Sequence, residues 1–378
     1  MVVAGEASGD LHAAHFVEAL RQLRPQAHFS GMGSRHMREA GVELLVDADE
    51  VSVMGVWEVL VKYPHLRERL GFLRRQMLAR RPDLLVLVDF VEFNLKLAEA
   101  AKAAGIPVLF YVSPQIWAWR PGRVKKIGER IDMMATIFPF EVPYYREAGI
   151  PVRYVGHPLV DEVRIEETKE EARSALGLED GGPLIGLLPG SRQSEVARIL
   201  PILLDSAELI RAQHPDARFV IPVAHTIRRE MIEERIAESG LPVQVVDGQS
   251  HRVMRASDVV VTASGTATLE VALVGTPMVI VYRLAALSHL ILSRLVTINH
   301  VGLPNIVAGR EIVREFIQGD ARPEAIAEEA LRILDDPAYR HRLLEGLAEV
   351  RTLLGEGRGP ERIAQVADEM LEGRILSE

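Results

Sequence analysis

The turn Pro189-Gly190-Ser191-Arg192 has residue types suited to holding phosphate. It follows the apolar, strand-like residues 184–188 and precedes a helical pattern. A helix N-terminus leaves backbone N–H groups unpaired and carries partial positive charge, glycine allows close approach of a ligand, and arginine binds anions through two hydrogen bonds. We therefore predict a phosphate site here, although most Pro-Gly turns only reverse the chain.

A second turn of this kind, Ser264-Gly265-Thr266, follows the buried strand expected at 259–262 and opens another helix. Loops after parallel strands gather at one sheet edge, so both turns can face one diphosphate. Glu270, one turn into the second helix, suits a ribose hydroxyl pair; the alternative is a glutamate that only complements the helix dipole. The predicted diphosphate-binding residues are Gly190, Ser191, Arg192, Ser264, Gly265 and Thr266.

The N-terminal half contains a strand-to-helix turn of small and acidic residues, Gly5 to Asp10. Phosphate is a poor ligand for an acidic turn, whereas sugar hydroxyls suit Glu6, Ser8 and Asp10, together with His12. We therefore predict an acceptor-binding role for this turn. Capping of the following helix by Ser8 or Asp10 is the alternative.

Asp89 ends the continuous apolar run 84–88 and is our candidate general base. Partial burial beside Phe90 raises the pKa of a carboxyl group and suits it to accept a proton from a hydroxyl nucleophile. Glu92 and Glu6 are alternative bases that the residues alone do not exclude.

An aromatic loop at 111–120 follows another expected strand and contains Trp117 and Trp119. Indole faces stack well on sugar rings and acyl chains, so both tryptophans are predicted to bind the acceptor. The alternative is that these residues form a surface loop anchored by two buried indoles, which the same sequence would give.

Strand and helix patterns alternate along most of the chain, which predicts an α/β protein with two doubly wound, Rossmann-like parallel sheets and a cleft between them. Strands are expected near 1–4, 28–31, 84–88, 108–112, 133–137 and 152–155, then near 184–188, 218–222, 243–246, 259–262 and 278–282, and only helices after 323. The predicted domains are 1–160, a connector at 161–182, 183–345, and C-terminal helices at 346–378 that pack on an N-terminal domain.

The composition excludes several classes of function. A net charge of -9 over 378 residues argues against a nucleic-acid partner, because such binding needs a basic face. The chain contains no cysteine, which removes disulfides and thiolate chemistry. The apolar stretch 284–303 is interrupted by charged and polar residues, and no signal peptide is evident, so cytoplasmic residence is expected.

A basic and apolar segment at 56–75 includes Val56, Trp57, Val59 and Leu60 beside several Lys and Arg residues. Such a helix can lie on an anionic membrane surface, although an ordinary amphipathic helix has the same spacing. No metal site is predicted: Asp47-Ala48-Asp49 lies in a turn away from both phosphate loops, and no metal-ligand motif occurs. We expect no cofactor and metal-independent chemistry, with Arg192 and the helix N-termini neutralising a leaving diphosphate.

These motifs occur in an order that closely resembles the lipid-A-disaccharide synthase family, over nearly the whole chain. The residues that carry the resemblance are Gly5 to Asp10, 53–55, 88–89, 93–94, 111–114, 117–120, 139–141, 156–158, 188–192, 263–270 and 303–305. The Trp-Ala-Trp-Arg run at 117–120 and the Ser-Gly-Thr-Ala-Thr-Leu-Glu run at 264–270 are the most specific.

The resemblance implies a GT-B fold and an inverting, metal-independent transfer of diacylglucosamine from UDP to the 6-hydroxyl of diacylglucosamine 1-phosphate. It implies that Asp89 and Arg192 are essential and that Thr266, Glu270 and Asn305 lie in the UDP site. Because both substrates carry acyl chains, it also favours contact of residues 56–75 with the cytoplasmic face of the inner membrane. The family often has Asp-Ala-Pro-Asp-Phe-Asn where this chain has 89–94, which departs by losing the proline.

Two other functions fit the same two-domain pattern. One is an enzyme like UDP-N-acetylglucosamine 2-epimerase, which acts on a soluble sugar nucleotide. The other is a two-lobed sensor that binds UDP without turnover. The sequence also leaves open the acyl-chain lengths, the oligomeric state, a homodimer with swapped C-terminal helices, and the strength of membrane association.

Overall fold

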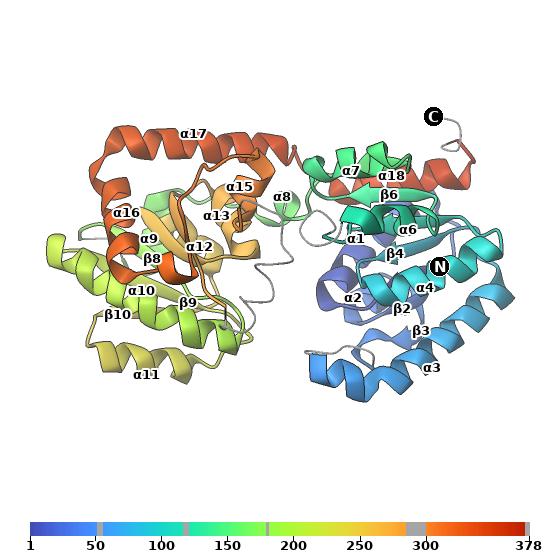
Figure 1. Ribbon diagram of the computed structural model, residues 1–378, viewed down its shortest axis with the longest axis horizontal. Coiled ribbons are helices and arrows are strands. Elements are labelled where there is room, and N and C mark those ends of the chain that lie inside the picture. Colours follow the sequence, from blue (N-terminus) through green and yellow to red (C-terminus); the bar gives the residue numbers. More distant parts are fainter. Residues whose placement is uncertain (51–55, 116–120, 179–180, 285–299, 375–378) are drawn as a thin grey trace. The chain divides into compact units, whose positions relative to one another are not determined.

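A computed structural model of the 378-residue chain describes residues 1–50, 56–115, 121–178, 181–284 and 300–374; the side chains of 56–63 and 121 are also outside the description. The chain forms two compact units (Figure 1). Unit 1 comprises Met1–Pro158 and the segment from Glu356 onward, and unit 2 comprises Leu159–Gly355. Each is an α/β unit around a parallel sheet, which confirms the predicted fold class.

Unit 1 contains a seven-stranded sheet in the order β3-β2-β1-β4-β5-β6-β7, in which every described pair is parallel. Its strands are β1 (Val2–Ala4), β2 (Ser30–Gly33), β3 (Glu43–Asp47), β4 (Leu85–Val88), β5 (Val108–Tyr111), β6 (Met133–Thr136) and β7 (Val152–Tyr154). Its helices are α1 (Ala7–Leu23), α2 (Arg35–Glu39), α3 (Val56–Arg80), α4 (Val91–Ala103), α6 (Val124–Gly128), α7 (Val142–Glu147) and α18 (Gly359–Leu371), with short 3-10 turns η1 (Ala48–Glu50), η2 (Pro121–Arg123) and η3 (Pro139–Glu141).

Unit 2 contains a six-stranded parallel sheet in the order β10-β9-β8-β11-β12-β13. Its strands are β8 (Leu184–Leu188), β9 (Arg218–Val223), β10 (Val243–Asp247), β11 (Val259–Ala263), β12 (Met278–Tyr282) and β13 (Glu315–Ile317). Its helices are α8 (Leu159–Glu162), α9 (Lys169–Ala175), α10 (Gln193–Gln213), α11 (Arg229–Ser239), α12 (Ser250–Ala256), α13 (Thr266–Val274), α15 (Leu303–Ala308), α16 (Pro323–Asp335) and α17 (Pro337–Leu353), with the 3-10 turn η4 (Gln318–Asp320).

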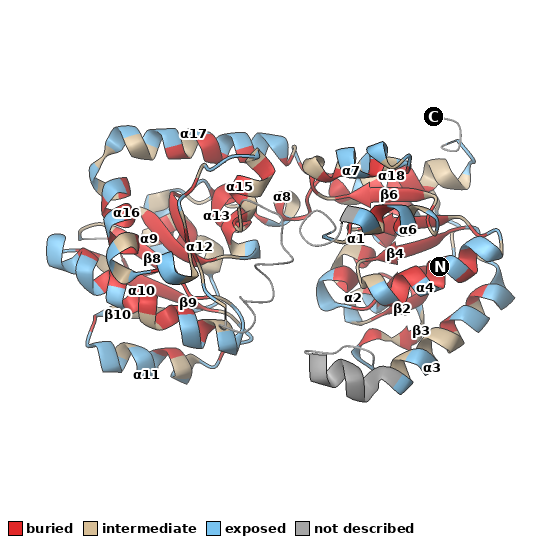
Figure 2. Cartoon of the chain, in the orientation of Figure 1, coloured by how far each residue is buried: buried red, intermediate tan, exposed pale blue. Residues whose placement is uncertain are grey.

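The central strands of both sheets are buried on both faces (Figure 2). All residues of β4, β5, β8 and β11 are buried, as expected for the near-continuous apolar runs of parallel strands covered by helices. Helix α1 buries Ala13, Phe16, Val17 and Leu20, whose spacing is that of one helix face. The apolar strands thus place the polar loops that follow them at the carboxyl edge of each sheet.

The last helix, α18, packs on α1 and so belongs to unit 1. Ile363, Ala364 and Ala367 join the core cluster that contains Phe16. Arg24 Nε on α1 lies 2.5 Å from Asp368 Oδ1 on α18. In this structure, the helix packs on a sheet of its own chain.

The divisions of the chain differ from the predicted ones in two places. The predicted connector at 161–182 is part of unit 2, because α9 packs on α12 and Arg173 Nη2 lies 2.6 Å from Asp258 Oδ2. The predicted tail boundary at 345/346 falls inside α17, whereas the units divide after Gly355. The sequence predicted that the C-terminal helices pack on an N-terminal domain, but the continuous helical pattern did not show at which residue the chain passes from one unit to the other.

Candidate functional site

The reversal of strand order identifies a loop pair at the carboxyl edge of each sheet. In unit 1 the order reverses between β1 and β4, where Ala4 pairs with Val88. In unit 2 it reverses between β8 and β11, where Leu188 pairs with Thr262. Ligands of open α/β sheets bind at such switch points. The four loops concerned are those that sequence analysis selected.

In unit 2, both loops line one pocket of about 850 Å³. The loop after β8 contributes Gly190, Ser191 and Arg192, and the loop after β11 contributes the residues from Ser264 to Ala267. Helices α10 and α13 begin directly after these loops. The pocket therefore combines two helix N-termini, which favour anions.

Arg192 supplies positive charge to this pocket. It is exposed, precedes the first residue of α10, and its guanidinium forms no ion pair within the described part of the chain. The loop that carries it is held by Thr226, whose hydroxyl donates to the Ser191 carbonyl over 2.6 Å. A fixed loop with an unpaired arginine is suited to bidentate binding of a phosphate.

Glu270 lies at the same pocket, one turn into α13. Its Oε2 is 3.5 Å from His251 Nε2 on α12. Hydrogen bonding to Glu270 raises the pKa of His251, while partial burial opposes the rise. The sequence pattern predicts Glu270 as a site residue but not His251, because only the fold brings residues from two helices together.

Asp89 is the main titratable group at the edge of unit 1. Its pKa is raised to about 6, mainly by burial and also by the negative charge of Glu6, while the Phe90 backbone N–H opposes the rise. The direction agrees with the predicted effect of partial burial, and it places the carboxyl group in a range useful for proton transfer near neutral pH.

The backbone at Asp89 is in an unusual conformation. Asp89 and Phe90 have φ values of 49° and 45°, and two successive left-handed residues other than glycine are uncommon and strained. Asn94 Nδ2 donates to the carbonyls of Asp89, over 2.7 Å, and Val88, over 3.3 Å. The ring of Phe90 occupies the space that a side chain on Gly5 would need. The β1 and β4 loops therefore interlock.

The remaining residues predicted for unit 1 are either exposed or outside the described part of the chain. Glu6 and Ser8 are exposed at the start of α1, where a ligand can reach them. Glu92 is also exposed and forms an ion pair with Arg123. Trp117 and Trp119 lie outside the described residues, as do the side chains of Val56, Trp57, Val59 and Leu60.

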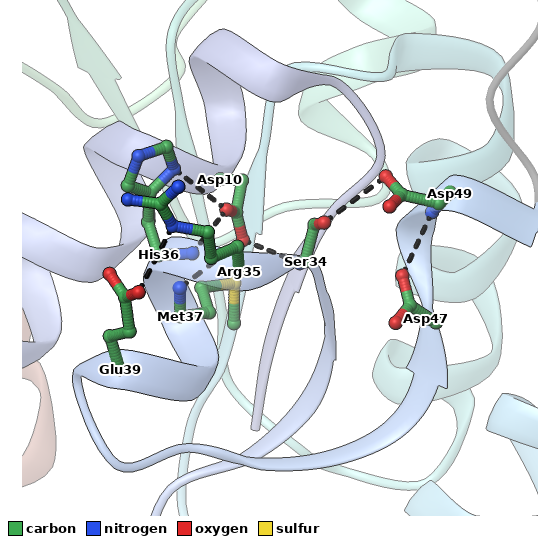
Figure 3. A network of polar contacts seen from close by, with 8 residues as sticks. All are labelled: Asp10, Ser34, Arg35, His36, Met37, Glu39, Asp47 and Asp49. Atoms are coloured by element: carbon green, nitrogen blue, oxygen red, sulfur yellow. Dashed lines mark hydrogen bonds and ion pairs between the residues drawn. The ribbon is translucent and has the colours of Figure 1, made fainter.

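Asp10 requires a correction. Its side chain is 2% exposed, and its oxygens accept backbone N–H groups of Ser34 at 2.6 Å, His36 at 2.9 Å and Met37 at 3.3 Å, with His36 Nδ1 3.1 Å away (Figure 3). These N–H groups have no intrahelical partners at the start of α2. Asp10 therefore caps α2, and we withdraw it from the acceptor-binding residues. The alternative prediction was that Asp10 caps the helix that follows its own turn, α1. Asp10 does cap a helix, but that helix is α2.

Asn305 also requires a correction. Its side chain is fully buried, its Nδ2 donates to Val313 O and to Glu315 Oε1, each at 2.7 Å, and its Oδ1 accepts the N–H groups of Ile312 at 2.7 Å and Val313 at 2.9 Å. Both donors and the acceptor are thus used within the protein. Asn305 does not line the pocket. Asn305 connects α15 to β13 and to the residues just before it. The geometry therefore does not place its side chain in contact with UDP.

The described residues contain no group of three or more His, Asp and Glu side chains that could hold a metal ion. None of the described helices is long and apolar enough to cross a membrane.

Comparison with known proteins decides the family. The family model described as lipid-A-disaccharide synthetase matches residues 1–355. Relatives named lipid-A-disaccharide synthase include that of Geobacter sulfurreducens, 47% identical over 99% of this chain and 98% of the relative, and that of Myxococcus xanthus, 46% identical over 99% and 98%. The chain belongs to the lipid-A-disaccharide synthase family. It is therefore a glycosyltransferase that transfers a hexosyl group.

Solved structures share the fold of this family member. A UDP-GlcNAc 2-epimerase from Neisseria meningitidis, solved bound to UDP-GlcNAc, is 13% identical with a TM-score of 0.64, and the match covers 97% of this chain and 99% of that one. The glycotransferase of kitacinnamycin is 16% identical with a TM-score of 0.64, covering 97% of each chain. At such low identity these likenesses show the GT-B-like fold alone. The family match, and not the fold, therefore separates this chain from the epimerases.

Proposed function

We propose that this enzyme transfers 2,3-diacylglucosamine from UDP to the 6-hydroxyl of 2,3-diacylglucosamine 1-phosphate, releasing UDP and the β-1,6 disaccharide 1-phosphate of lipid A biosynthesis. The observation that carries the proposal is the pocket of unit 2, in which two helix N-termini, Arg192 and Glu270 offer partners for a diphosphate and a ribose. The two sugar substrates are those that the resemblance to the family implies.

The proposed reaction is a single displacement. The acceptor hydroxyl oxygen attacks the anomeric carbon of the donor, the bond from that carbon to the UDP oxygen breaks, and Asp89 takes the hydroxyl proton. One displacement inverts the anomeric centre. Asp89 is favoured over Glu92 because burial raises the pKa of Asp89, whereas Glu92 is exposed and paired with Arg123.

Charge on the departing UDP is offset by Arg192 and by the N-termini of α10 and α13, without a metal ion. Gly190, Ser191, Ser264, Gly265 and Thr266 contribute the surrounding backbone. For the acceptor we retain Glu6 and Ser8 from the exposed turn, and Trp117 and Trp119 from the aromatic loop.

The acyl chains of both substrates require access to a membrane surface. We propose peripheral contact with the cytoplasmic face of the inner membrane through residues 56–75, with Val56, Trp57, Val59 and Leu60 as the docking residues. Co-sedimentation with anionic vesicles tests this proposal. Replacing Trp57 with Glu is expected to reduce the bound fraction at unchanged thermal stability, and unchanged binding would contradict it.

The deciding experiment incubates the purified protein with UDP-2,3-diacylglucosamine and 2,3-diacylglucosamine 1-phosphate in detergent and EDTA. We expect UDP release together with a product of disaccharide mass, and loss of both in Asp89→Asn. A folded wild type that binds UDP but forms no disaccharide would overturn the proposal. Conversion of UDP-N-acetylglucosamine to its 2-epimer would then identify the epimerase alternative, and no turnover of either substrate would indicate the sensor.

A further inference from the structure

Glu270 has one oxygen committed within the protein and one that remains for a ligand. Its side chain is 22% exposed, and Oε2 faces His251 at 3.5 Å. No hydrogen bond to Oε1 occurs among the described residues, and Glu270 lines the pocket beside the Ser264 loop. A carboxylate can bind two hydroxyl groups only when it is ionised and held in a suitable orientation.

His251 can both favour the ionised form of the Glu270 carboxylate and hold it in one orientation. It is the second residue of α12, which packs on α13, so its imidazole reaches Glu270 from a neighbouring helix. The hydrogen bond to Glu270 and the negative charges of Glu270 and Glu162 raise the pKa of His251 against the effect of its burial. When the ring is protonated, its contact with Glu270 is charge-assisted, and such contacts are about twice as strong as neutral ones.

We propose that His251 is a positioning residue for Glu270, fixing Oε2 so that Oε1 is presented to the ribose hydroxyls of the nucleotide. This inference rests on the proposed function, because it takes the pocket to be the UDP site. A carboxylate fixed before binding loses less conformational entropy when the ligand arrives. His251 therefore contributes to the recognition of the ribose without touching the nucleotide.

The test compares UDP with 2′,3′-dideoxy-UDP, which lacks both ribose hydroxyls, by titration calorimetry on the full chain. For wild type we expect UDP to bind more tightly than the dideoxy compound. His251→Ala is expected to weaken UDP binding by roughly tenfold and to leave dideoxy-UDP binding unchanged. In a Glu270→Gln background, the same change is expected to have no further effect on UDP.

His341 provides a matched control. It forms a His–Glu pair of the same kind with Glu345, Nε2 to Oε1 3.4 Å, on the exposed surface of α17. His341→Ala is expected to leave the affinity for both nucleotides unchanged. His251→Gln serves as a second variant if His251→Ala does not fold, with circular dichroism as the check.

The outcomes separate this inference from the proposed function. If wild type binds UDP but His251 variants weaken both nucleotides equally, or neither, the positioning role is wrong and the proposed function is unaffected. If folded wild type binds no UDP, the proposed function fails, and the positioning role fails with it. The positioning role is supported if His251→Ala weakens the binding of UDP but not of dideoxy-UDP, and if this effect disappears in the Glu270→Gln background.

Discussion

The carboxylate of Glu195, in the first turn of α10, occupies the space that the Cβ atom of a side chain at Gly190 would need. Oε2 of Glu195 also accepts the N–H of Ser191 at 3.2 Å. Gly190 has φ of 112°, a conformation that L-residues with side chains rarely adopt. The glycine therefore allows both the backbone turn and the contact between Glu195 and the Ser191 N–H.

Replacing Gly190 with alanine is expected to lower UDP affinity at least tenfold and to destabilise the fold by about 1–3 kcal/mol, because alanine is strained at this φ and displaces the Glu195 side chain from the Ser191 N–H. Calorimetry with UDP and urea unfolding measure the two effects. Gly177→Ala is the control: its φ is 68°, but nothing lies near the added carbon, so we expect backbone strain alone and unchanged UDP affinity. Equal losses of affinity in both variants would contradict this role for the loop.

The raised pKa of Asp89 predicts a pH dependence for the transfer. A general base acts when deprotonated, so kcat/KM is expected to be level above about pH 6 and to fall about tenfold per pH unit below it. Asp89→Asn is expected to reduce kcat by about 10²–10⁴-fold with UDP affinity retained. The pH–rate profile and calorimetry provide the measurements.

Glu6 gives a control for this assignment. Its negative charge helps to raise the pKa of Asp89, so Glu6→Gln is expected to move the acid limb of the profile to lower pH. Glu92→Gln is expected to leave the limb in place. If Glu92→Gln abolished transfer as completely as Asp89→Asn does, or if Glu6→Gln did so at saturating acceptor, the base would have to be reassigned.

The corrected position of Asn305 leads to a third prediction. Asn305→Ala leaves three backbone groups without their partner and removes one of the donors to Glu315, so we expect a loss of roughly 3 kcal/mol in the free energy of unfolding. UDP affinity of the folded protein at low temperature is expected to stay within about twofold of wild type. A selective loss of affinity at unchanged thermal stability would instead restore the direct UDP contact implied by the family resemblance.

Sequence patterns predicted the site loops well because each loop follows a long apolar strand, and parallel strands place their following loops at one edge. Leu184 to Leu188 before Gly190 is an example. The missed strands β3 and β13 lie at sheet edges and are short, with charged residues at their ends: Glu43 and Asp47 flank the apolar residues of β3, and β13 begins with Glu315. Strand pattern therefore predicts the centre of each sheet better than its edges.

The misassigned side chains share a different cause. Asp10 bonds to residues 24 to 27 positions away, and His251 meets Glu270 across two helices. Local spacing shows that a carboxylate or amide follows a strand, but not whether backbone donors already occupy it. Asp10 and Asn305 have residue types suited to ligands and are used by the fold, whereas Asp89 and Glu270 retain capacity for a substrate.

A buried histidine in unit 1 predicts how stability changes with pH. His157 is 8% exposed and packs on Phe138, with ring centroids 4.7 Å apart. Its pKa is lowered from 6.5 to about 3, mainly by burial and also by the charge of the neighbouring His12. Below pH 6.5, His157 binds a proton in the unfolded chain but stays neutral in the folded chain until the pH approaches its lowered pKa. His157 therefore makes the fold less stable as pH falls, by about 1.4 kcal/mol per pH unit.

Urea unfolding at pH 7, 6 and 5 measures this effect as the difference between wild type and His157→Gln. Relative to the variant, wild type is expected to lose stability between pH 6 and 5 and to change little above pH 7, because both states are then neutral at this position. His12→Gln is expected to show the same sign over a shorter range, since the pKa of His12 is lowered to about 4. A difference that stayed constant with pH would mean that His157 is hydrated or charged in the folded protein, and the packing against Phe138 would then not exclude water.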